Sequence, residues 1–372
     1  KLINTDYIEI SLFTLNYIGQ ALLAMLLIQQ VDAQVTQFYK RPVSDSTLSE
    51  GFSLHGSSLL YFRNNEYFSG AYPGFTALGA NNELSGNYRH GRHFISTGMM
   101  YSLAFGQPMR HRVLPVITYQ YSLARHLNIV MGTLSGPAEH KLPQELLGLD
   151  RYLYHPLEYG LQFTYQPGWM DADIWIDWRN NIMHGDSAQE EFTQGSRFIF
   201  HLLNKGGWNI DANAILLFYH NGGQIDRSDA PTMTRINYSV GMNLSRQISR
   251  WKYSISGQYF GFYNDEDFTA FPWKEGNAYS ISLQAENATL CLGTAFKNFH
   301  HFFTLNGDQV FSIFNQYESR IYGESKKLVT GFARIQLMNI KNFKIGFGAE
   351  LYHDLNSRHT DYNYNIIGRF LF

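Results

Sequence analysis

Hydrophobic and polar residues alternate with a period of two along most of the chain from about residue 53 onward. In one such stretch Phe343, Ile345 and Phe347 alternate with Lys344 and Gly346. The same alternation is clear in residues 158–166, 170–179 and 235–244. Successive side chains of a β-strand point to opposite faces of its sheet, so this pattern predicts strands with one apolar and one polar face.

The length of these segments distinguishes a soluble β-sandwich from a membrane barrel. They run for about 11–15 residues, whereas strands of soluble sheets most often have about 5–6. A tilted strand needs about 9–11 residues to cross a bilayer. Tyr, Trp and Phe also gather at the segment ends, where membrane barrels carry aromatic girdles. The pattern therefore favours a transmembrane barrel.

Short turns and long loops alternate between the predicted strands. The short turns fall at residues 90–92, 124–125, 167–168, 205–206, 248–249, 287 and 341. The longer polar stretches fall at residues 106–110, 136–155, 181–190, 221–232, 264–274, 298–326 and 356–359. A first strand at Ser53–Arg63 and a last strand at Thr360–Phe372 complete the series. The prediction is an all-β, antiparallel up-and-down barrel of about 16 strands, with both termini in the periplasm.

The composition narrows the function further. Charged residues make up only 16% of the chain, the net charge is −2, and there is one cysteine, Cys291. The near-neutral charge argues against a nucleic-acid partner, because no basic run would neutralise phosphates. The single cysteine excludes an internal disulfide framework and a Cys-rich zinc site. No phosphate-binding loop, metal-ligand spacing or nucleophile elbow occurs, so we expect no cofactor and no metal.

The chain before the barrel has two predicted parts. Residues 1–33 contain the apolar run ALLAMLLI and a small residue at Ala33, which is typical of a secretory signal peptide. A buried N-terminal helix is the alternative. Residues 34–52 are polar and are predicted to form a periplasmic tail, partly tucked into the lumen, ahead of the barrel at residues 53–372.

The last predicted strand carries a family resemblance. Its outward-facing residues are Tyr364, Ile366, Gly368, Phe370 and Phe372. A final strand that alternates in this way and ends on Phe looks like the insertion signal of Gram-negative outer-membrane β-barrels, and the rhythm of turns and loops resembles that of porins. The resemblance implies a place in the cell outer membrane among lipid and lipopolysaccharide, and handling by the barrel-assembly machinery. It does not imply an oligomeric state.

Charged residues on the polar face of the strands predict the properties of the lumen. An acidic wall is expected from Glu158, Asp171, Asp173, Asp177 and Asp211. A basic wall is expected from Arg89, Arg334, Lys344 and Arg369. In a ring of about 16 strands the two walls face each other, and the field between them would select among ions and dipolar solutes. The alternative is that these charges pair with neighbours, such as Arg179 beside Asp177, and only hydrate the wall.

Two long loops are candidates for narrowing the pore. Residues 298–326 are unusually aromatic for an exposed segment, and residues 136–155 form the second candidate. The aromatic loop either folds into the mouth of the barrel or packs its own side chains together as an external cap.

Three functions remain open at this point. The leading prediction is an outer-membrane channel for passive or weakly selective diffusion of small hydrophilic solutes. The second is a closed or gated barrel that docks a partner protein or a surface glycan. The third is a hydrolase acting on lipid, lipopolysaccharide or peptide, with His220 and Asp226 or His353 and Asp354 at the rim. Because no spacing selects those residues, we expect that the chain is not an enzyme.

Overall fold

A computed structural model describes residues 38–39, 41, 50–69, 72–106, 108–223, 225–266, 271–315 and 320–372. The predicted signal peptide at residues 1–33 lies outside the described residues. Of the predicted tail at residues 34–52, Phe38, Tyr39, Arg41 and residues 50–52 are described.

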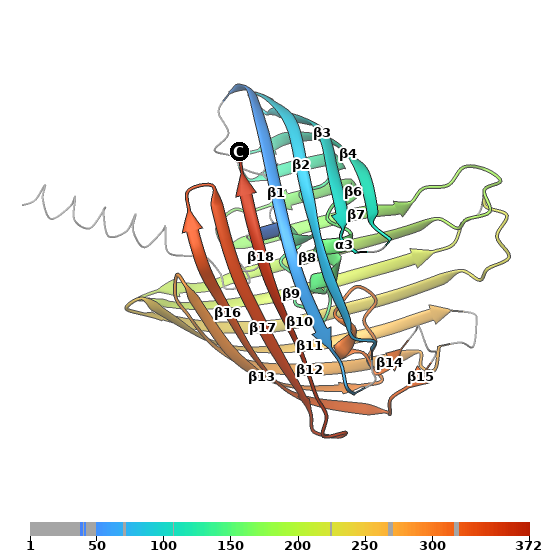
Figure 1. The fold of residues 1–372 in the computed structure, drawn as a ribbon, viewed down its shortest axis with the longest axis vertical. Coiled ribbons are helices and arrows are strands. Elements are labelled where there is room, and N and C mark those ends of the chain that lie inside the picture. The colour runs from blue at the N-terminus through green and yellow to red at the C-terminus, as the bar shows by residue number, and fades with distance from the viewer. Residues whose placement is uncertain are drawn as a thin grey trace, which may run out of the picture.

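Sixteen strands of the described chain form one closed barrel, in which every neighbouring pair is antiparallel (Figure 1). They are β1 (Gly51–Glu66), β2 (Phe75–His90), β3 (His93–Ala104), β4 (Arg110–Ala124), β5 (Leu127–Thr133), β6 (Tyr159–Tyr165), β7 (Met170–Asn180), β8 (Glu191–Lys205), β9 (Trp208–Asn221), β10 (Met233–Ile248), β11 (Trp251–Glu266), β12 (Glu275–Glu286), β13 (Leu290–His300), β16 (Ser325–Ile340), β17 (Phe343–Asp354) and β18 (Thr360–Leu371). The first strand pairs with the last, from Ser57 opposite Leu371 to Glu66 opposite Tyr362. The predicted all-β barrel is confirmed.

The two ends of the barrel differ in their connections. We call the end with the short connections, such as Gly91–Arg92 and Ser249–Arg250, the turn end, and the other the loop end. β1 begins and β18 finishes at the turn end. The assignment of the turn end to the periplasm remains a prediction.

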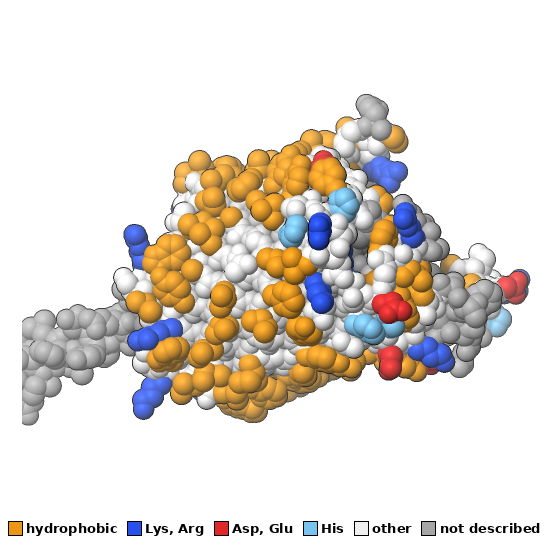
Figure 2. Space-filling model, turned by 90° about the horizontal axis from the view of Figure 1, so that it is seen from below, with side chains coloured by type: hydrophobic (Ala, Val, Ile, Leu, Met, Phe, Trp, Pro, Cys, Tyr) orange, Lys and Arg blue, Asp and Glu red, His pale blue; other side chains and the backbone are white. Residues whose placement is uncertain are grey.

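The outward face of the barrel is apolar. Large side chains stand exposed along its strands, for example Ile117, Val240 and Leu351, with 64%, 53% and 55% of their surface accessible. In Figure 2 hydrophobic side chains spread over one side of the wall, and most charged side chains gather toward its two ends. A wall of this kind is stable when lipid covers it.

The last strand presents its predicted insertion face outward. Ile366, Phe370 and Phe372 are exposed on the wall. The backbone N–H of Gly56 donates to the carbonyl of Phe372 at 2.8 Å, and a Cβ at Gly56 would collide with the Phe372 ring. Glycine at this position therefore allows β18 to close against β1. The role of this face in insertion stays a prediction.

β5 and β6 are shorter than predicted, with seven residues each. β4 pairs with β5 only from Thr118 to Ala124, so residues 110–117 of β4 have no strand on that side. Pro115 lies in this segment. Proline has no backbone N–H, and on this side no strand is present that would need one for pairing. The hydroxyl of Tyr159 donates to the Pro115 carbonyl at 3.0 Å instead.

Two connections at the loop end fold back into the barrel. The connection between β5 and β6 contains the 3₁₀ helix η2 (Pro137–His140) and the helix α3 (Leu149–Tyr154). The connection between β13 and β16 contains the 3₁₀ helix η3 (Gln309–Phe311) and a small sheet of β14 (Phe314–Asn315) and β15 (Arg320–Ile321). No helix of the described residues is long and apolar enough to cross a membrane.

Candidate functional sites in the lumen and on the loop-end wall

The two inward loops form a plug with its own hydrophobic core. Leu146, Phe302, Phe303 and Phe311 are fully buried within one apolar cluster. That cluster also contains wall residues that point into the lumen: Val130, Trp175, Ile215, Leu217, Phe260, Phe262, Ala278, Phe299, Leu328 and Tyr352. The loop at residues 298–326 therefore folds inward, which is the first of the two alternatives considered for it. Its aromatic side chains are those of a core rather than of an exposed cap.

The acidic wall on β6 and β7 anchors the first plug loop through His140. The Nδ1 atom of His140 lies 2.7 Å from Asp173 Oδ2, and its Nε2 atom lies 2.7 Å from Glu158 Oε2. The ring stacks on Trp175 with 3.6 Å between ring centroids. Gly195, the partner of Trp175 on β8, makes room for the indole, since a Cβ there would lie 2.1 Å from it.

Both ring nitrogens of His140 are thus held by carboxylates. Burial lowers the pKa of His140, but the charges of Glu158 and Asp173 outweigh this effect and raise that pKa to about 10. An imidazolium with both N–H groups engaged cannot accept a proton, so His140 is excluded as a general base. Its geometry is that of a structural anchor.

The other acidic-wall residues also contact cations. Asp171 accepts from Lys141 at 3.0 Å and lies 3.2 Å from Arg197, and Asp177 lies 2.7 Å from Arg151 of α3. Asp211 lies 2.7 Å from His201. Of the five predicted acidic residues, Glu158 contacts the plug alone, and Asp171, Asp173 and Asp177 each contact both the plug and the wall. Arg179 of the wall also lies 3.8 Å from Asp177.

The predicted basic residues lie in the lumen on β2, β16, β17 and β18. Arg334 lies 3.2 Å from Glu350, Lys344 faces Arg369 in the strand register, and Arg89 lies over the ring of Phe94. β7 and β17 are eight strands apart in the ring of sixteen, so the two walls face each other across the plug. Whether their field selects among solutes stays a prediction.

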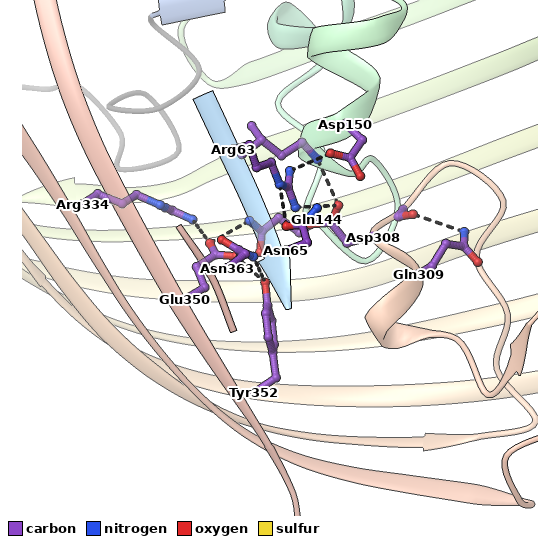
Figure 3. Close-up of polar contacts among 12 residues, drawn as sticks. Arg63, Asn65, Gln144, Asp150, Asp308, Gln309, Arg334, Glu350, Tyr352 and Asn363 are labelled. Carbon is purple, nitrogen blue, oxygen red and sulfur yellow. Dashed lines mark hydrogen bonds and ion pairs between the residues drawn. The ribbon is translucent and has the colours of Figure 1, made fainter. Parts of the chain in front are cut away.

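A polar cluster joins both plug loops to the wall at the centre of the lumen (Figure 3). Arg63 of β1, which is 1% exposed, lies 3.2 Å from Asp150 of α3 and 3.6 Å from Asp308 of the second loop. Burial raises the pKa of Asp308 to about 7, although Arg63 opposes this change. One guanidinium therefore holds both loops.

Glu350 of β17 is the second centre of the cluster. It accepts from Gln144 at 2.8 Å and from Asn363 at 3.2 Å, and the Tyr352 hydroxyl donates to it. Sequence reasoning missed this cluster, because Arg63, Asp150, Asp308 and Glu350 are far apart in the chain. The alternation of apolar and polar residues could place Arg63 and Glu350 in the lumen. No local sequence pattern indicates that the loops contact them.

Below the plug, toward the turn end, the lumen contains a cavity of about 280 Å³. Lys141, Gln144 and Glu145 of the first plug loop form its ceiling, and strands β8 to β13, β16 and β17 line its sides. A 16-strand barrel is wide enough to leave an aqueous channel, so the two plug loops rather than the side chains of the wall fill the loop-end part of this lumen.

Two pairs of histidine and threonine lie on the outer wall at the loop end. His353 Nδ1 lies 2.9 Å from Thr360 Oγ1, and His220 Nδ1 lies 3.0 Å from Thr234 Oγ1. In each pair the two residues face each other across a hairpin. The acids expected beside them are engaged elsewhere, since Asp354 accepts from the Asn356 N–H and Asp226 from the Ser228 N–H.

The surroundings of the two pairs differ in charge. Near His353 the exposed loop-end residues include Lys327, Arg358 and His359, and we call these three the basic patch; Glu324, directly before β16, is the exposed carboxylate nearest to them in the chain. His220 instead lies against Phe192 and Phe218, 5.3 Å and 6.3 Å between ring centroids. The exposed charged residues of the arc from β7 to β12 at the loop end are Asp186, Asp229, Asp265, Glu275, Arg227 and Lys274. The His353 pair is therefore the better placed for an anionic substrate.

Solved structures with a similar fold include a porin and other outer-membrane proteins. The anion-selective porin of Comamonas acidovorans aligns with a TM-score of 0.52 at 10% identity over 87% of this chain and 100% of its own. OprD of Pseudomonas aeruginosa aligns with a TM-score of 0.51 at 10% identity over 89% and 97%. OmpT of Vibrio cholerae aligns with a TM-score of 0.51 at 9% identity over 87% and 99%. These likenesses establish the fold.

Sequence comparison corrects one expectation. No curated protein sequence matches the chain. The sequence profile of the lipid A 3'-O-deacylase-type family matches residues 44–370, which is nearly all of the predicted mature chain. The expectation that the chain is not an enzyme is therefore wrong, because this is an enzyme family. It rested on the lack of a local catalytic motif, but catalytic residues are brought together by the fold and need not be close in sequence. The chain belongs to the lipid A 3'-O-deacylase-type family.

Proposed function

We propose that this protein is an outer-membrane ester hydrolase that removes an acyl chain from a phosphorylated glycolipid of the lipid A class. The observation that carries the proposal is the family match over residues 44–370. The structure supports it in two ways. A plug with a hydrophobic core fills part of the lumen, and a histidine with a hydroxyl partner lies on the lipid-facing wall.

The outer wall around His353 has the polarity that such a substrate requires. Lys327, Arg358 and His359 lie at the loop end, where phosphates of a lipid headgroup would be. Val329, Leu351 and Ile366 are exposed lower on the same strands, with 41%, 55% and 45% of their surface accessible. Acyl chains would lie along these apolar side chains. The ester would then lie between the two zones, at the level of His353.

In this arrangement His353 acts as the general base. If its Nδ1–H donates to Thr360 Oγ1, the Nε2 lone pair is free to take a proton from water. The water oxygen attacks the ester carbonyl, the bond to the sugar oxygen breaks, and the proton passes to that oxygen. The products are a fatty acid and a glycolipid with a free hydroxyl. Thr360 is a positioning residue that fixes the tautomer and the orientation of the ring.

Variants of the two pairs test the assignment in lipid A-containing proteoliposomes, with fatty-acid release measured by mass spectrometry. We expect His353→Ala to lower kcat/KM by about 10²–10⁴, the usual contribution of a general base. Thr360→Val should lower the rate and Thr360→Ser should restore it. The matched control is His220→Ala, which removes the other pair and should leave the rate unchanged.

A gated channel is the second candidate. The porin-like 16-strand wall and the polar cavity below the plug favour it. In this case the plug would have to move for solutes to pass, and the facing acidic and basic walls would act as the filter. Ion-selectivity ratios in planar bilayers before and after Asp171→Asn and Asp173→Asn test this function. An unchanged ion preference would show that these walls do not act as an ion filter.

A further inference from the structure

The cavity at the turn end of the lumen has a charge pattern that the hydrolase function does not use. Five cationic side chains line it, from Lys141, Arg197, Lys252, Lys297 and Arg334. Three carboxylates line it as well, from Glu145, Asp211 and Glu350. Lys297 pairs with Glu145 at 2.6 Å and Arg334 with Glu350 at 3.2 Å, so these charges are balanced locally.

Near Asp171, at one end of the cavity, cations outnumber carboxylates. Asp171 is shared by two cations, Lys141 at 3.0 Å and Arg197 at 3.2 Å. The Arg197 side chain is 2% exposed, and its Nε and NH1 atoms have no hydrogen-bond partner among the described residues. Two cations that share one carboxylate leave an excess of positive charge, which an anionic ligand beside them would offset.

The rest of the lining suits hydroxyl groups. Ser256 and Ser282 lie side by side with 2.6 Å between their hydroxyl oxygens, and Gln258 bonds to Asn213 beside them. Each of these groups both donates and accepts, so each can exchange its present bond for one to a sugar hydroxyl. Phe260 and Phe332 add apolar surface. A volume of about 280 Å³ lies at the lower limit of ligand pockets, which fits a molecule the size of a monosaccharide.

We propose that this cavity is a binding site for a small polyhydroxylated anion, such as a phosphorylated or carboxylated sugar, which enters from the turn end. Arg197 and Lys141 would hold the anionic group beneath the plug. The serine and amide side chains of β11 and β12 would hold the hydroxyl groups. The site is separate from the basic patch on the outer wall and does not depend on the proposed hydrolysis.

Calorimetry on the full detergent-solubilised chain tests the site with three probes: glucose 6-phosphate, glucose and inorganic phosphate. We expect glucose 6-phosphate to bind more tightly than either fragment. Arg197→Gln should weaken its binding about tenfold or more, as the loss of a charged hydrogen bond does. Arg250→Gln, at an exposed turn outside the cavity, is the matched control and should bind like the wild type.

Three results would overturn the proposal. These are no binding of glucose 6-phosphate at millimolar concentration, equal affinity for glucose and glucose 6-phosphate, and an unchanged affinity in Arg197→Gln. If Arg197→Gln fails to fold, as judged by its heat-modifiable mobility in gel electrophoresis, Lys141→Gln replaces it. Lys141 lines the cavity beside Asp171 and is less buried than Arg197, and its substitution should also weaken binding.

Discussion

His140 shows how one side chain holds a loop inside a barrel. Gly136, with φ at 95°, turns the chain into η2, and Pro137 begins that helix, so the ring of His140 is carried toward β7. Glu158 and Asp173 then hold it as an imidazolium. Its pKa is raised from an ordinary value near 6.5 to about 10 in the folded protein. The ion pairs therefore contribute stability that is fully present below pH 6.5 and is lost as the pH rises through about 10.

Replacing this residue tests the anchor. We expect His140→Gln to lower the free energy of unfolding by about 3–5 kcal/mol near neutral pH, since it leaves two buried carboxylates without their cation. The variant should also lose stability less steeply than the wild type between pH 6.5 and 10. Thermal unfolding followed by circular dichroism measures both effects.

The control for this experiment is His184→Gln, because His184 lies exposed in the loop between β7 and β8. It should unfold like the wild type at every pH. A His140→Gln protein with wild-type stability would show that the plug is held by its apolar core alone.

At the scale of elements, the strands were predictable and the plug was not. Alternation of apolar and polar residues fixes which face of β7 or β17 meets lipid, and turn residues such as Gly91 and Ser249, with φ of 56° and 54°, mark where strands reverse. No comparable sequence pattern predicts the conformation of the loops. Aromatic residues such as Phe302, Phe303 and Phe311 are compatible with an external cap and with a buried plug. Only their contacts with distant strands distinguish the two.

The His–Thr pairs illustrate the same limit. Sequence reasoning chose His353 and His220 at the rim but gave them the neighbouring acids Asp354 and Asp226 as partners. The hairpin register places Thr360 and Thr234 opposite them instead. Counting residues outward from the predicted loops would have paired His353 with Tyr362 and His220 with Met233, so only the observed register identifies both hydroxyls.

Removal of one loop tests the plug as an element. We expect replacement of residues 302–323 by a short Gly-Ser linker to turn a silent barrel into one with conductance steps in planar bilayers, because 16 strands leave an aqueous lumen once the filling is gone. A matched replacement of the exposed residues 225–231 should leave the barrel silent. Silence after both replacements would mean that loop 134–158 closes the lumen by itself.

At the scale of the whole molecule, the barrel has an apolar exterior and an interior that is partly filled by the plug. Wall residues such as Leu351 are exposed to lipid, while Leu146 and Phe311 of the plug have no exposed surface. The proposed chemistry therefore lies on the outside of the molecule, at the boundary between lipid headgroups and acyl chains. Porin-like architecture and hydrolase family membership are compatible because each uses a different surface of the same barrel.

We infer that this protein acts on lipid at its outer wall rather than on solutes through its lumen. Proteoliposomes that contain lipid A and an ion-sensitive dye allow fatty-acid release and ion flux to be recorded from one preparation. We predict fatty-acid release without ion flux from the wild type, and neither from His353→Ala. Ion flux without fatty-acid release from a correctly folded wild-type barrel would contradict the account.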